Sequence, residues 1–516
     1  MPQPSPNADT EARAVAEGGL RWPLGRAVTT GLVVFAAVWL SLLALMSLSP
    51  PDDNIEQLNW VRALEWGYYK HPPLPTWLLW LPVHIFGLSA AVSNVLGAAC
   101  TLGALAIVWR LLVTLRGHTY AGIALLAMLC VTYYSRRLNY YNHEVVLMLL
   151  SAACAAIAWQ AFGNPSRPGW IALGCALGLG ALAKYQMAVS AACVLAFAIH
   201  RRAWRHPGHR RGLLLSVMIA LVFIAPHLVW VVRHDFLPLH YALDSSLDAR
   251  LSPPDRIVEA AHWLTDQLLN RALPAFLLLG VAAVTARERG SKPLRAEASS
   301  VTADGSRAFL LIWGLVPLAF VAATGLLFGA RLPLHWGLPF LLFVVPAAME
   351  LMPRNRFRQS DPAVVIGSFL MIQGLLLVSL QLSSPKGILA DRVRGWSRFD
   401  SHDLARDVAA AARARLGGPI RIVAGDGAIA GALALQLPER PLVLIGGRFD
   451  ISPWVDPALL GKCGALEIGW DLADSWPVGS GHPGLRWRIL PPLRNSSNCV
   501  GSGSRPPLAQ ARRGAR

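Results

Sequence analysis

Long apolar segments follow one another along most of the chain and are separated by short polar ones. About eleven of them reach or approach the ~20 residues that a helix needs to cross a ~30 Å hydrocarbon core. They cover 27–49, 88–115, 119–135, 142–162, 169–185, 186–200, 212–232, 272–286, 308–328, 335–351 and 361–382. The pattern therefore predicts a polytopic α-helical membrane protein. Within it, 169–200 also fits one long tilted span with a re-entrant piece.

The N-terminal segment is polar. Residues 1–26 precede the first apolar run and lack the small-residue cleavage site of a signal peptide. We therefore expect a short cytoplasmic tail and an uncleaved first span.

The composition changes again from about residue 383, where Pro, Gly, Asp and Arg become frequent and span-length apolar runs stop. Residues 403–416 have the pattern of an amphipathic helix, and 419–425 and 441–447 that of short buried strands. This mixture predicts a small α/β domain over 383–500. Residues 501–516 are expected to be disordered.

The distribution of Lys and Arg predicts the orientation. Hydrophobic residues make up 54% of the 516 residues and charged residues 15%, and the net charge is +17. In a membrane protein such an excess of positive charge belongs in cytoplasmic loops, which argues against nucleic-acid binding. The basic loops are 200–211, 287–307 and 352–360; the loops 50–87, 136–141, 233–271 and 329–334 are poorer in positive charge. We therefore place the N-terminus inside and the C-terminal domain outside, in the periplasm.

The seven cysteines do not form a metal motif. Five of them lie in apolar runs and are expected to be small hydrophobic residues: Cys100, Cys130, Cys154, Cys175 and Cys193. Cys463 and Cys499 share the C-terminal region, and they could form a disulfide if that region faces an oxidising compartment.

The first outer loop carries an unusual set of polar residues. Asp52, Asp53 and Glu56 follow the first span directly, and the loop continues as Tyr-Tyr-Lys-His-Pro-Pro at 68–73. If 54–66 is helical with Asp53 at its start, Asp53 and Glu56 lie on one face at i, i+3 spacing. The alternative is an ordinary solvated loop with an interfacial helix.

Other ionisable residues lie at the outer ends of predicted spans. They are Arg136, Arg137, His143 and Glu144 at the outer end of the fourth span, Lys184 with Tyr185 at the outer end of the fifth, His262 and Asp266 just before the eighth, and His335 at the start of the tenth, just after Arg331. Ionisable groups at bilayer depth are costly and mark function by default. Each one alone could instead be a snorkelling or capping residue.

Together these residues suit transfer of a group from a lipid-linked phosphate. A carboxylate can take the proton of an acceptor hydroxyl or amine, and cations can stabilise the departing phosphate. Asp53 is the natural base, with Glu56 or Glu144 as the second carboxylate. Lys184, Arg137 and His335 are the natural phosphate partners.

Several segments resemble bacterial GT-C glycosyltransferases of the aminoarabinose transferase and protein-O-mannosyltransferase-like family. The resemblance rests on the loop "DDNIEQLNWVRALEWGYYKHPPLPTWL", on "NHEVVLMLL", on "ALGLGALAKYQMAV" and on "LPLHWGLPFLL". It extends into the C-terminal region through "RIVAGDGAIAGALAL" and "RFDISPWVDPALLGKCGALEIGW". It covers nearly the whole chain and implies a GT-C fold, with a transmembrane domain over 27–382 whose catalytic periplasmic loop is 50–87.

The resemblance also implies roles for single residues. It places Asp53 at the catalytic acidic position, Glu144 at a second acidic position, and Tyr68, Lys184, Tyr185 and His335 in the matching motifs. Asn54 stands where many relatives carry Glu. The family implies an inverting transfer of a sugar from a polyprenyl-phosphate donor in the bacterial inner membrane. Some relatives use a divalent metal, which Asp52, Asp53 and His71 could hold, although no spacing demands one.

Three functions are open to a membrane protein with these residues. A glycosyltransferase fits best, with a lipid A or lipopolysaccharide, another lipid, a polysaccharide or a protein as acceptor. A transporter or flippase of lipid-linked sugars would need ionisable residues near the membrane midplane and repeat symmetry, neither of which is evident. A scaffold that binds a partner through its C-terminal domain would not require the acidic loop after the first span.

Overall fold

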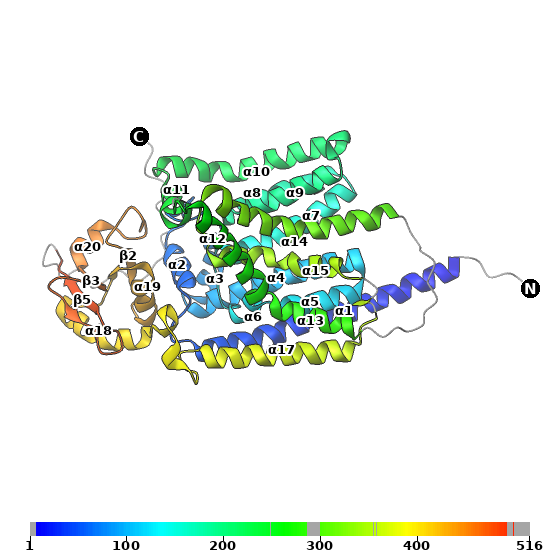
Figure 1. The fold of residues 1–516 in the computed structure, drawn as a ribbon. Helices are drawn as coiled ribbons and strands as arrows, with labels where there is room; N and C mark the ends of the chain where they lie inside the picture. Colours follow the sequence, from blue (N-terminus) through cyan, green and yellow to red (C-terminus); the bar gives the residue numbers. More distant parts are fainter. Residues whose placement is uncertain are drawn as a thin grey trace, which may run out of the picture. The chain divides into compact units, whose positions relative to one another are not determined.

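A computed structural model describes residues 7–247, 249–285, 300–353, 356–357, 359–492 and 499, and its contacts divide the chain into two compact units (Figure 1). The first consists of the chain up to Ser47, Trp66–Pro75 and Ala91–Arg392. The second consists of Leu48–Glu65, Thr76–Ala90 and the chain from Val393 onward. The domain bounds expected from the sequence stay a prediction.

The first unit is helical. Its α-helices are α1 (Asn7–Met46), α4 (Ala90–Arg116), α5 (His118–Leu129), α6 (Thr132–Arg136), α7 (His143–Gly163), α8 (Arg167–Ala183), α9 (Met187–His200), α10 (Pro207–Arg233), α11 (Leu237–Ala242), α12 (Pro253–Thr265), α13 (Leu273–Val284), α14 (Ser300–Phe328), α15 (Val344–Leu351) and α17 (Pro362–Ser383). Short 3-10 or π-helical segments are η1 (Ala203–Arg205), η2 (Leu243–Leu247), η3 (Asp266–Arg271), η4 (Leu334–Phe343) and η5 (Ala390–Arg392).

The prediction of a multi-pass membrane protein is confirmed. Among the described residues, seven helices are long and apolar enough to cross a membrane, or eight if the bent pair α12–α13 is one span. The shorter apolar helices α5, α8 and α9 match three further predicted spans. The number of eleven spans and the orientation stay predictions. Residues 1–6, 286–299 and 501–516, to which the expected tails and part of a basic loop belong, lie outside the described residues.

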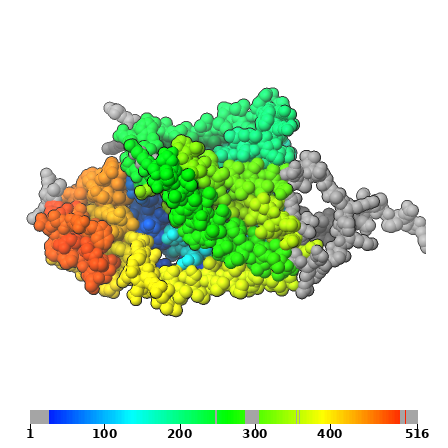
Figure 2. All heavy atoms as spheres, viewed as in Figure 1, coloured from blue at the N-terminus to red at the C-terminus, as the bar shows by residue number. Residues whose placement is uncertain are grey.

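Two long helices of this unit present apolar side chains on its surface, as membrane spans do. On α10 these include Leu214, Met218 and Val222, and on α17 they include Leu370 and Met371. Figure 2 shows both helices on the surface of the first unit, α10 in teal and α17 in yellow. Exposed apolar faces of this kind are expected to contact lipid.

Close helix packing fixes the position of α8, which carries the Gly-rich sequence. A Cβ at Gly174 would collide with α10 at Ser216 and Ile219, and one at Gly178 would collide with Phe223. Small residues allow helix backbones to approach closely in a membrane. The chain then breaks between α8 and α9, because Lys184 adopts an extended conformation with φ −161° and ψ 141°. Of the two arrangements expected for 169–200, the structure forms two short helices.

The second unit contains the predicted α/β domain. Its helices are α2 (Asp52–Trp60), α3 (Leu74–Phe86, whose first two residues belong to the first unit), η6 (Gly395–Arg398), α18 (Ser401–Leu416), α19 (Gly427–Gln436) and α20 (Pro457–Cys463). Its strands are β1 (Ile422–Gly425), β2 (Leu442–Ile445), β3 (Ala465–Trp470), β4 (Trp476–Pro477) and β5 (Leu485–Leu490). The sheet order is β2-β1-β3-β5-β4. β1 pairs in parallel with β2 and β3, whereas β5 is antiparallel to β3 and β4.

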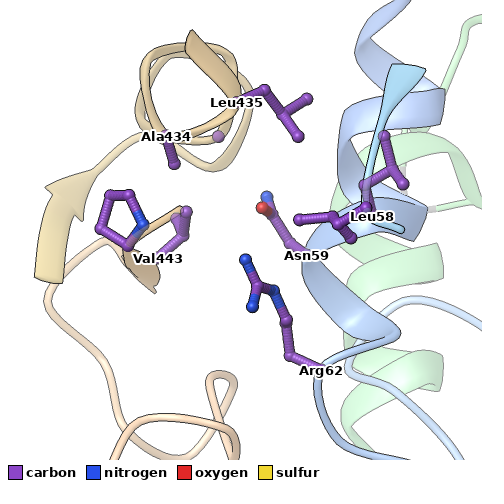
Figure 3. A pocket seen from close by; sticks show the side chains of 9 residues that line it. Leu58, Asn59, Arg62, Ala434, Leu435 and Val443 are labelled. Carbon is purple, nitrogen blue, oxygen red and sulfur yellow. The ribbon is translucent and has the colours of Figure 1, made fainter. Parts of the chain in front are cut away.

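The helix α2 packs on α19 within this unit. Asn59 donates a hydrogen bond to the Gly427 carbonyl at 3.0 Å, and Arg62 donates one to the Arg440 carbonyl at 3.0 Å. A small pocket remains beside this contact, with Asn59 and Arg62 pointing toward it between apolar walls (Figure 3).

The helix α2 ends at Trp60, earlier than the predicted residue 66. The carbonyl of Glu65 instead accepts a hydrogen bond from the Trp77 indole at 2.9 Å.

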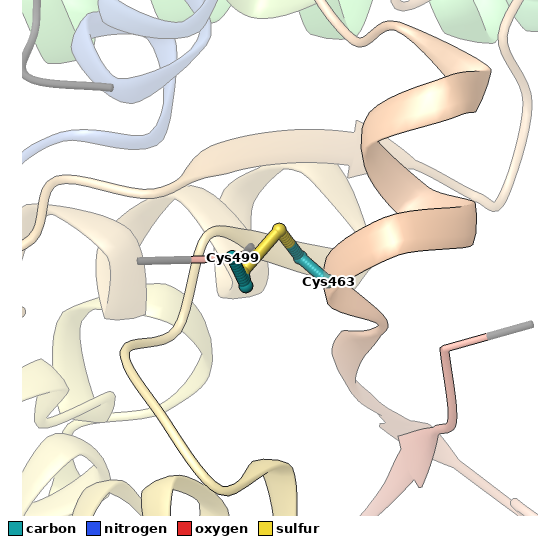
Figure 4. Close-up of a disulfide and its surroundings, with 2 residues drawn as sticks. All are labelled: Cys463 and Cys499. Atoms are coloured by element: carbon teal, nitrogen blue, oxygen red, sulfur yellow. A yellow bond between two sulfur atoms is a disulfide. The ribbon is translucent and has the colours of Figure 1, made fainter. Parts of the chain in front are cut away.

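The cysteines form the expected groups. Cys463, the last residue of α20, is bonded to Cys499, with the two Cα atoms 5.3 Å apart (Figure 4). The other five cysteines are free thiols, and all but Cys175 are buried. A disulfide is typical of proteins that face an oxidising compartment.

Candidate active site

Glu144 lies in the first turn of α7 and is the centre of a buried polar cluster. The Asn142 side chain caps this helix by accepting a hydrogen bond from the Val145 backbone amide at 3.0 Å. A carboxylate in the first turn is favoured by the partial positive charge of a helix N-terminus. The Glu144 side chain is only 6% exposed, so it needs charged or hydrogen-bonding partners.

Two basic side chains supply those partners. Lys184, which ends α8, contacts the Glu144 Oε1 atom with its Nζ and is itself only 9% exposed. His335, near the start of η4, has its Nε2 3.4 Å from the same oxygen, but its side chain is 48% exposed. The cluster therefore has a buried ion pair on one side and an accessible imidazole on the other.

The segment Trp66–Pro75 contributes His71, which forms a pair with His143. The backbones of Tyr68 and His71 exchange two hydrogen bonds, of 3.0 and 3.2 Å, which fold the segment into a tight turn. The His71 ring lies 4.1 Å from the ring of His143, and Lys70 lies over the rings of Tyr69 and Tyr241. Burial, and then the positive charges nearby, lower the pKa of His71 well below its ordinary value. We therefore expect His71 to be neutral at physiological pH.

A cluster of arginine and tyrosine side chains contacts the residue that precedes His335. Arg137 and Arg271 place their guanidinium carbons 5.8 and 4.6 Å from the centre of the Tyr133 ring. The Tyr133 hydroxyl donates a hydrogen bond to the carbonyl of Leu334 at 2.6 Å. Arg271 is oriented by Asp266, with an N···O distance of 3.0 Å. This arrangement ties the two cations to the residue that precedes His335.

The acidic residues of the first outer loop lie on α2, in the second unit. Ile55 and Asn59 point toward α19, because a Cβ at Gly431 would collide with both. Around a helix of 3.6 residues per turn, Asp53 is about 120–160° from Ile55 and Asn59, so it lies on the side of α2 that faces away from α19. Glu56 is about 60–100° from them and lies between the two sides. Asp52 is exposed.

The structure thus brings together part of the predicted site. Six predicted residues lie in the first unit, and Lys184 and His335 both contact Glu144 there. The other three are Tyr68, Tyr185 and Arg137. Asp52, Asp53 and Glu56 belong to the second unit, so their place beside the Glu144 cluster stays a prediction. The same holds for a metal held by Asp52, Asp53 and His71.

Sequence reasoning missed Tyr133 and Arg271. Arg271 ends the π-helical segment η3 at the 55° bend between α12 and α13, and π-helical turns leave no regular sequence pattern. Its position immediately before an apolar run that begins Ala-Leu-Pro was the available signal. Tyr133 lay inside the predicted span 119–135, where nothing distinguished it from a core residue.

The chain is similar to known proteins over most of its length. Residues 70–230 match the family described as dolichyl-phosphate-mannose-protein mannosyltransferase. The chain is 23% identical over 449 residues to the lipopolysaccharide core galacturonosyltransferase RgtA of Rhizobium johnstonii, covering 81% of this chain and 83% of that one. It is 24% identical over 401 residues to RgtB of the same organism, covering 76% and 77%.

A solved structure has a similar fold. The crystal structure of ArnT from Cupriavidus metallidurans, bound to undecaprenyl phosphate, aligns with a TM-score of 0.57 and 14% identity. The alignment covers 92% of this chain and 100% of that one. Both the membrane-embedded helices and the small C-terminal domain are therefore parts of a shared architecture.

Proposed function

We propose that this chain is a GT-C membrane glycosyltransferase that transfers a sugar from a polyprenyl-phosphate donor to an acceptor outside the inner membrane. The family match over 70–230, the similarity to RgtA and RgtB and the ArnT-like fold support this. The ArnT structure with the same fold holds undecaprenyl phosphate, which supports a lipid-linked donor. The transfer inverts the anomeric carbon, as the family resemblance implies.

The Glu144–Lys184–His335 cluster is the observation that supports this proposal most. Two basic groups converge on one buried carboxylate at the ends of apolar helices, and one of them is half exposed. Ionisable groups at membrane depth are costly, so by default such a grouping marks a functional site. A phosphate can approach from the exposed side of His335 and share Lys184 with Glu144. Arg137 supplies further positive charge for the departing phosphate.

The acceptor is deprotonated by Asp53 in this proposal. Asp53 and Glu56 share one side of α2, so one carboxylate can act as base while the other orients it or the acceptor. Glu144 is the second acidic residue of the site, and Tyr68 and Tyr185 contact the donor.

A glycolipid of the lipopolysaccharide type is the first acceptor to test. RgtA and RgtB are named as lipopolysaccharide core galacturonosyltransferases, and the chain resembles both over most of its length. Another lipid, a polysaccharide or a protein are the other acceptors. Divalent-metal dependence is tested separately, by adding EDTA and then restoring single metal ions.

Mass spectrometry of envelope lipids and glycans from a strain that lacks the protein tests the proposal. The mutant should lack one sugar on one envelope component, and the wild-type gene should restore it. Asp53→Asn, inserted at the wild-type level, should not restore it. Asp407→Asn changes an exposed carboxylate on α18 and is the matched control, which should restore the sugar.

Two results would contradict the proposal. An unchanged set of glycans in the deletion strain would exclude transfer as its activity in the envelope. Restoration by Asp53→Asn would remove Asp53 as the base. Loss of a flippase would instead leave a lipid-linked sugar accumulating on the inner side, which extraction of the lipid pool measures.

A further inference from the structure

His227 is a buried histidine within the apolar helix α10 whose two ring nitrogens are both engaged. The residue is 0% exposed. Its Nδ1 lies 2.7 Å from the carbonyl oxygen of Trp66, and its Nε2 lies 2.7 Å from the hydroxyl of Tyr185. It therefore joins three segments that are far apart in the sequence: α10, the start of Trp66–Pro75, and the break between α8 and α9.

The chemistry of these partners determines the tautomer. A carbonyl oxygen can only accept a hydrogen bond, so Nδ1 must carry the proton. In the neutral ring, Nε2 then carries a lone pair and accepts the hydrogen bond from the Tyr185 hydroxyl. The two contacts orient the ring and use both of its nitrogens. A histidine kept only for its apolar bulk would not need both contacts.

The surrounding packing holds the ring in place. Trp230, one turn further along α10, lies nearly parallel to the His227 ring, with an interplanar angle of 12°. A Cβ at Gly67 would collide with the Trp230 ring, so Gly67 allows the Trp66–Pro75 segment to pack against α10. The contact between this segment and α10 is therefore both hydrogen-bonded and sterically close.

Both segments that His227 holds lead directly into the Glu144 cluster. Tyr185 follows Lys184, whose Nζ contacts Glu144. Trp66 precedes the turn formed by Tyr68 and His71, and His71 packs on His143, the neighbour of Glu144. A shift at either hydrogen bond of His227 would therefore change the spacing between Lys184 and the Tyr68–His71 turn.

We propose that His227 is a positioning residue that sets this spacing and so shapes the site for the phosphate of the lipid donor. It contacts neither donor nor acceptor and acts through Tyr185 and Trp66. The inference rests on the proposed function for the identity of the ligand. His227 thereby fixes the distance between Lys184 on one side of the site and the Tyr68–His71 turn on the other.

Titration of the full-length protein in lipid nanodiscs with undecaprenyl phosphate tests the inference. His227→Leu removes both hydrogen bonds and should weaken binding about tenfold, which corresponds to about 1.4 kcal/mol. His227→Gln can donate to the Trp66 carbonyl and accept from Tyr185, and should stay within about threefold of the wild type. His227→Phe keeps an aromatic ring, removes both hydrogen bonds and should weaken binding as much as His227→Leu. It serves if His227→Leu does not fold.

His209→Ala is the matched control. His209 lies on the same helix, near its other end, where its Nε2 contacts the carbonyl of Phe162 at 3.1 Å. This variant should bind undecaprenyl phosphate as the wild type does. A purely structural role of His227 would lower the yield of folded protein in His227→Leu without changing the affinity of the protein that remains.

Three results would overturn the inference. They are wild-type affinity in both His227→Leu and His227→Phe, equal weakening in His227→Gln and His227→Leu, and no binding by the wild type. The proposed function is judged separately by transfer in the envelope. A protein that transfers sugar but whose affinity is indifferent to position 227 would refute only the positioning role.

Discussion

Two buried ion pairs lie at opposite ends of the span formed by η4 and α15, and they are built differently. His335 of one cluster and Glu350 of the other are separated by roughly 25–30 Å along this span, from the rises of 3-10 and α-helix. At the Glu350 end, Arg116 donates two hydrogen bonds to the carboxylate, at 2.7 and 3.0 Å. Tyr120 adds a third at 3.1 Å, and Ser306 accepts one from Arg116 at 2.6 Å.

The Glu144 end also pairs a carboxylate with basic side chains, but its charged groups are less completely buried. The Glu350 pair is closed: its side chains are 8% and 0% exposed, and hydroxyl groups fill the remaining hydrogen-bonding positions. The Glu144 cluster has the exposed imidazole of His335 on one side. A closed pair fits a structural role, whereas a pair with an accessible cationic partner can exchange that partner for a ligand. The comparison therefore separates a helix-joining contact from a site.

Replacing each carboxylate by its amide should separate the two ends most strongly. Glu144→Gln should lower transfer by a factor on the order of 10² to 10⁴, because it removes the charge that pairs with Lys184 and His335. Glu350→Gln should leave transfer per folded molecule within about threefold. Quantifying the modified glycan at equal membrane levels of protein measures both. Equal losses of transfer in the two variants would remove the distinction between the ends.

Stability should respond in the opposite order. Glu350→Gln leaves the buried Arg116 without its counter-charge and should cost about 3–5 kcal/mol. A double variant, Arg116→Met with Glu350→Leu, replaces the pair by apolar groups and should regain most of that loss. Thermal unfolding in detergent measures the changes. If the double variant is no more stable than the single one, the pair contributes more than charge compensation.

Removing the exposed partner should have a smaller effect. His335→Ala should raise the apparent KM for the lipid donor about threefold to tenfold, equivalent to about 0.7–1.4 kcal/mol. The effect is limited because the side chain is 48% exposed and its nitrogen is 3.4 Å from Glu144. His262→Ala, at an exposed position of α12, should leave KM unchanged. An unchanged KM in His335→Ala would place donor binding elsewhere.

The last expected effect is a pH dependence of stability at His71. Burial lowers its pKa well below 6.5 in the folded protein, whereas the unfolded chain protonates near 6.5. The unfolded state therefore binds the extra proton, and stability falls as the pH drops below 6.5, by up to about 1.4 kcal/mol per pH unit. Above 6.5 the term is constant. His71→Gln should reduce the slope of melting temperature between pH 6.5 and 5; an unchanged slope would show that His71 protonates freely when folded.

The sequence predicted those parts of the fold that depend on local patterns. Apolar length predicted the membrane helices, and short β-branched runs predicted β1 and β2. β5 was missed although Leu485, Trp487 and Ile489 alternate with arginines, because charged residues interrupt the run. The order of the sheet depends on long-range pairing and could not be obtained from local propensity.

The candidate site was predictable to the extent that its residues interrupt apolar segments. Glu144, Lys184 and His335 lie at the ends of apolar runs, and the family motifs ranked them. His227 was not found, because it lies inside the predicted span 212–232 and gains its meaning only from Trp66 and Tyr185. Arg271 depends on the π-helical turn that orients it. Such residues follow from how helices rotate against one another, which apolar periodicity does not specify.

Photo-crosslinking tests most directly whether the Glu144 end of the membrane unit binds the donor phosphate. An undecaprenyl phosphate with a photoreactive group next to the phosphate is added to the full-length protein in nanodiscs, and labelled peptides are identified by mass spectrometry. We predict labels in peptides that contain Lys184–Gln186 and Leu334–Gly337, reduced by excess unmodified lipid. Competed labelling at Arg116 and Glu350, with none at Lys184 or His335, would contradict the account.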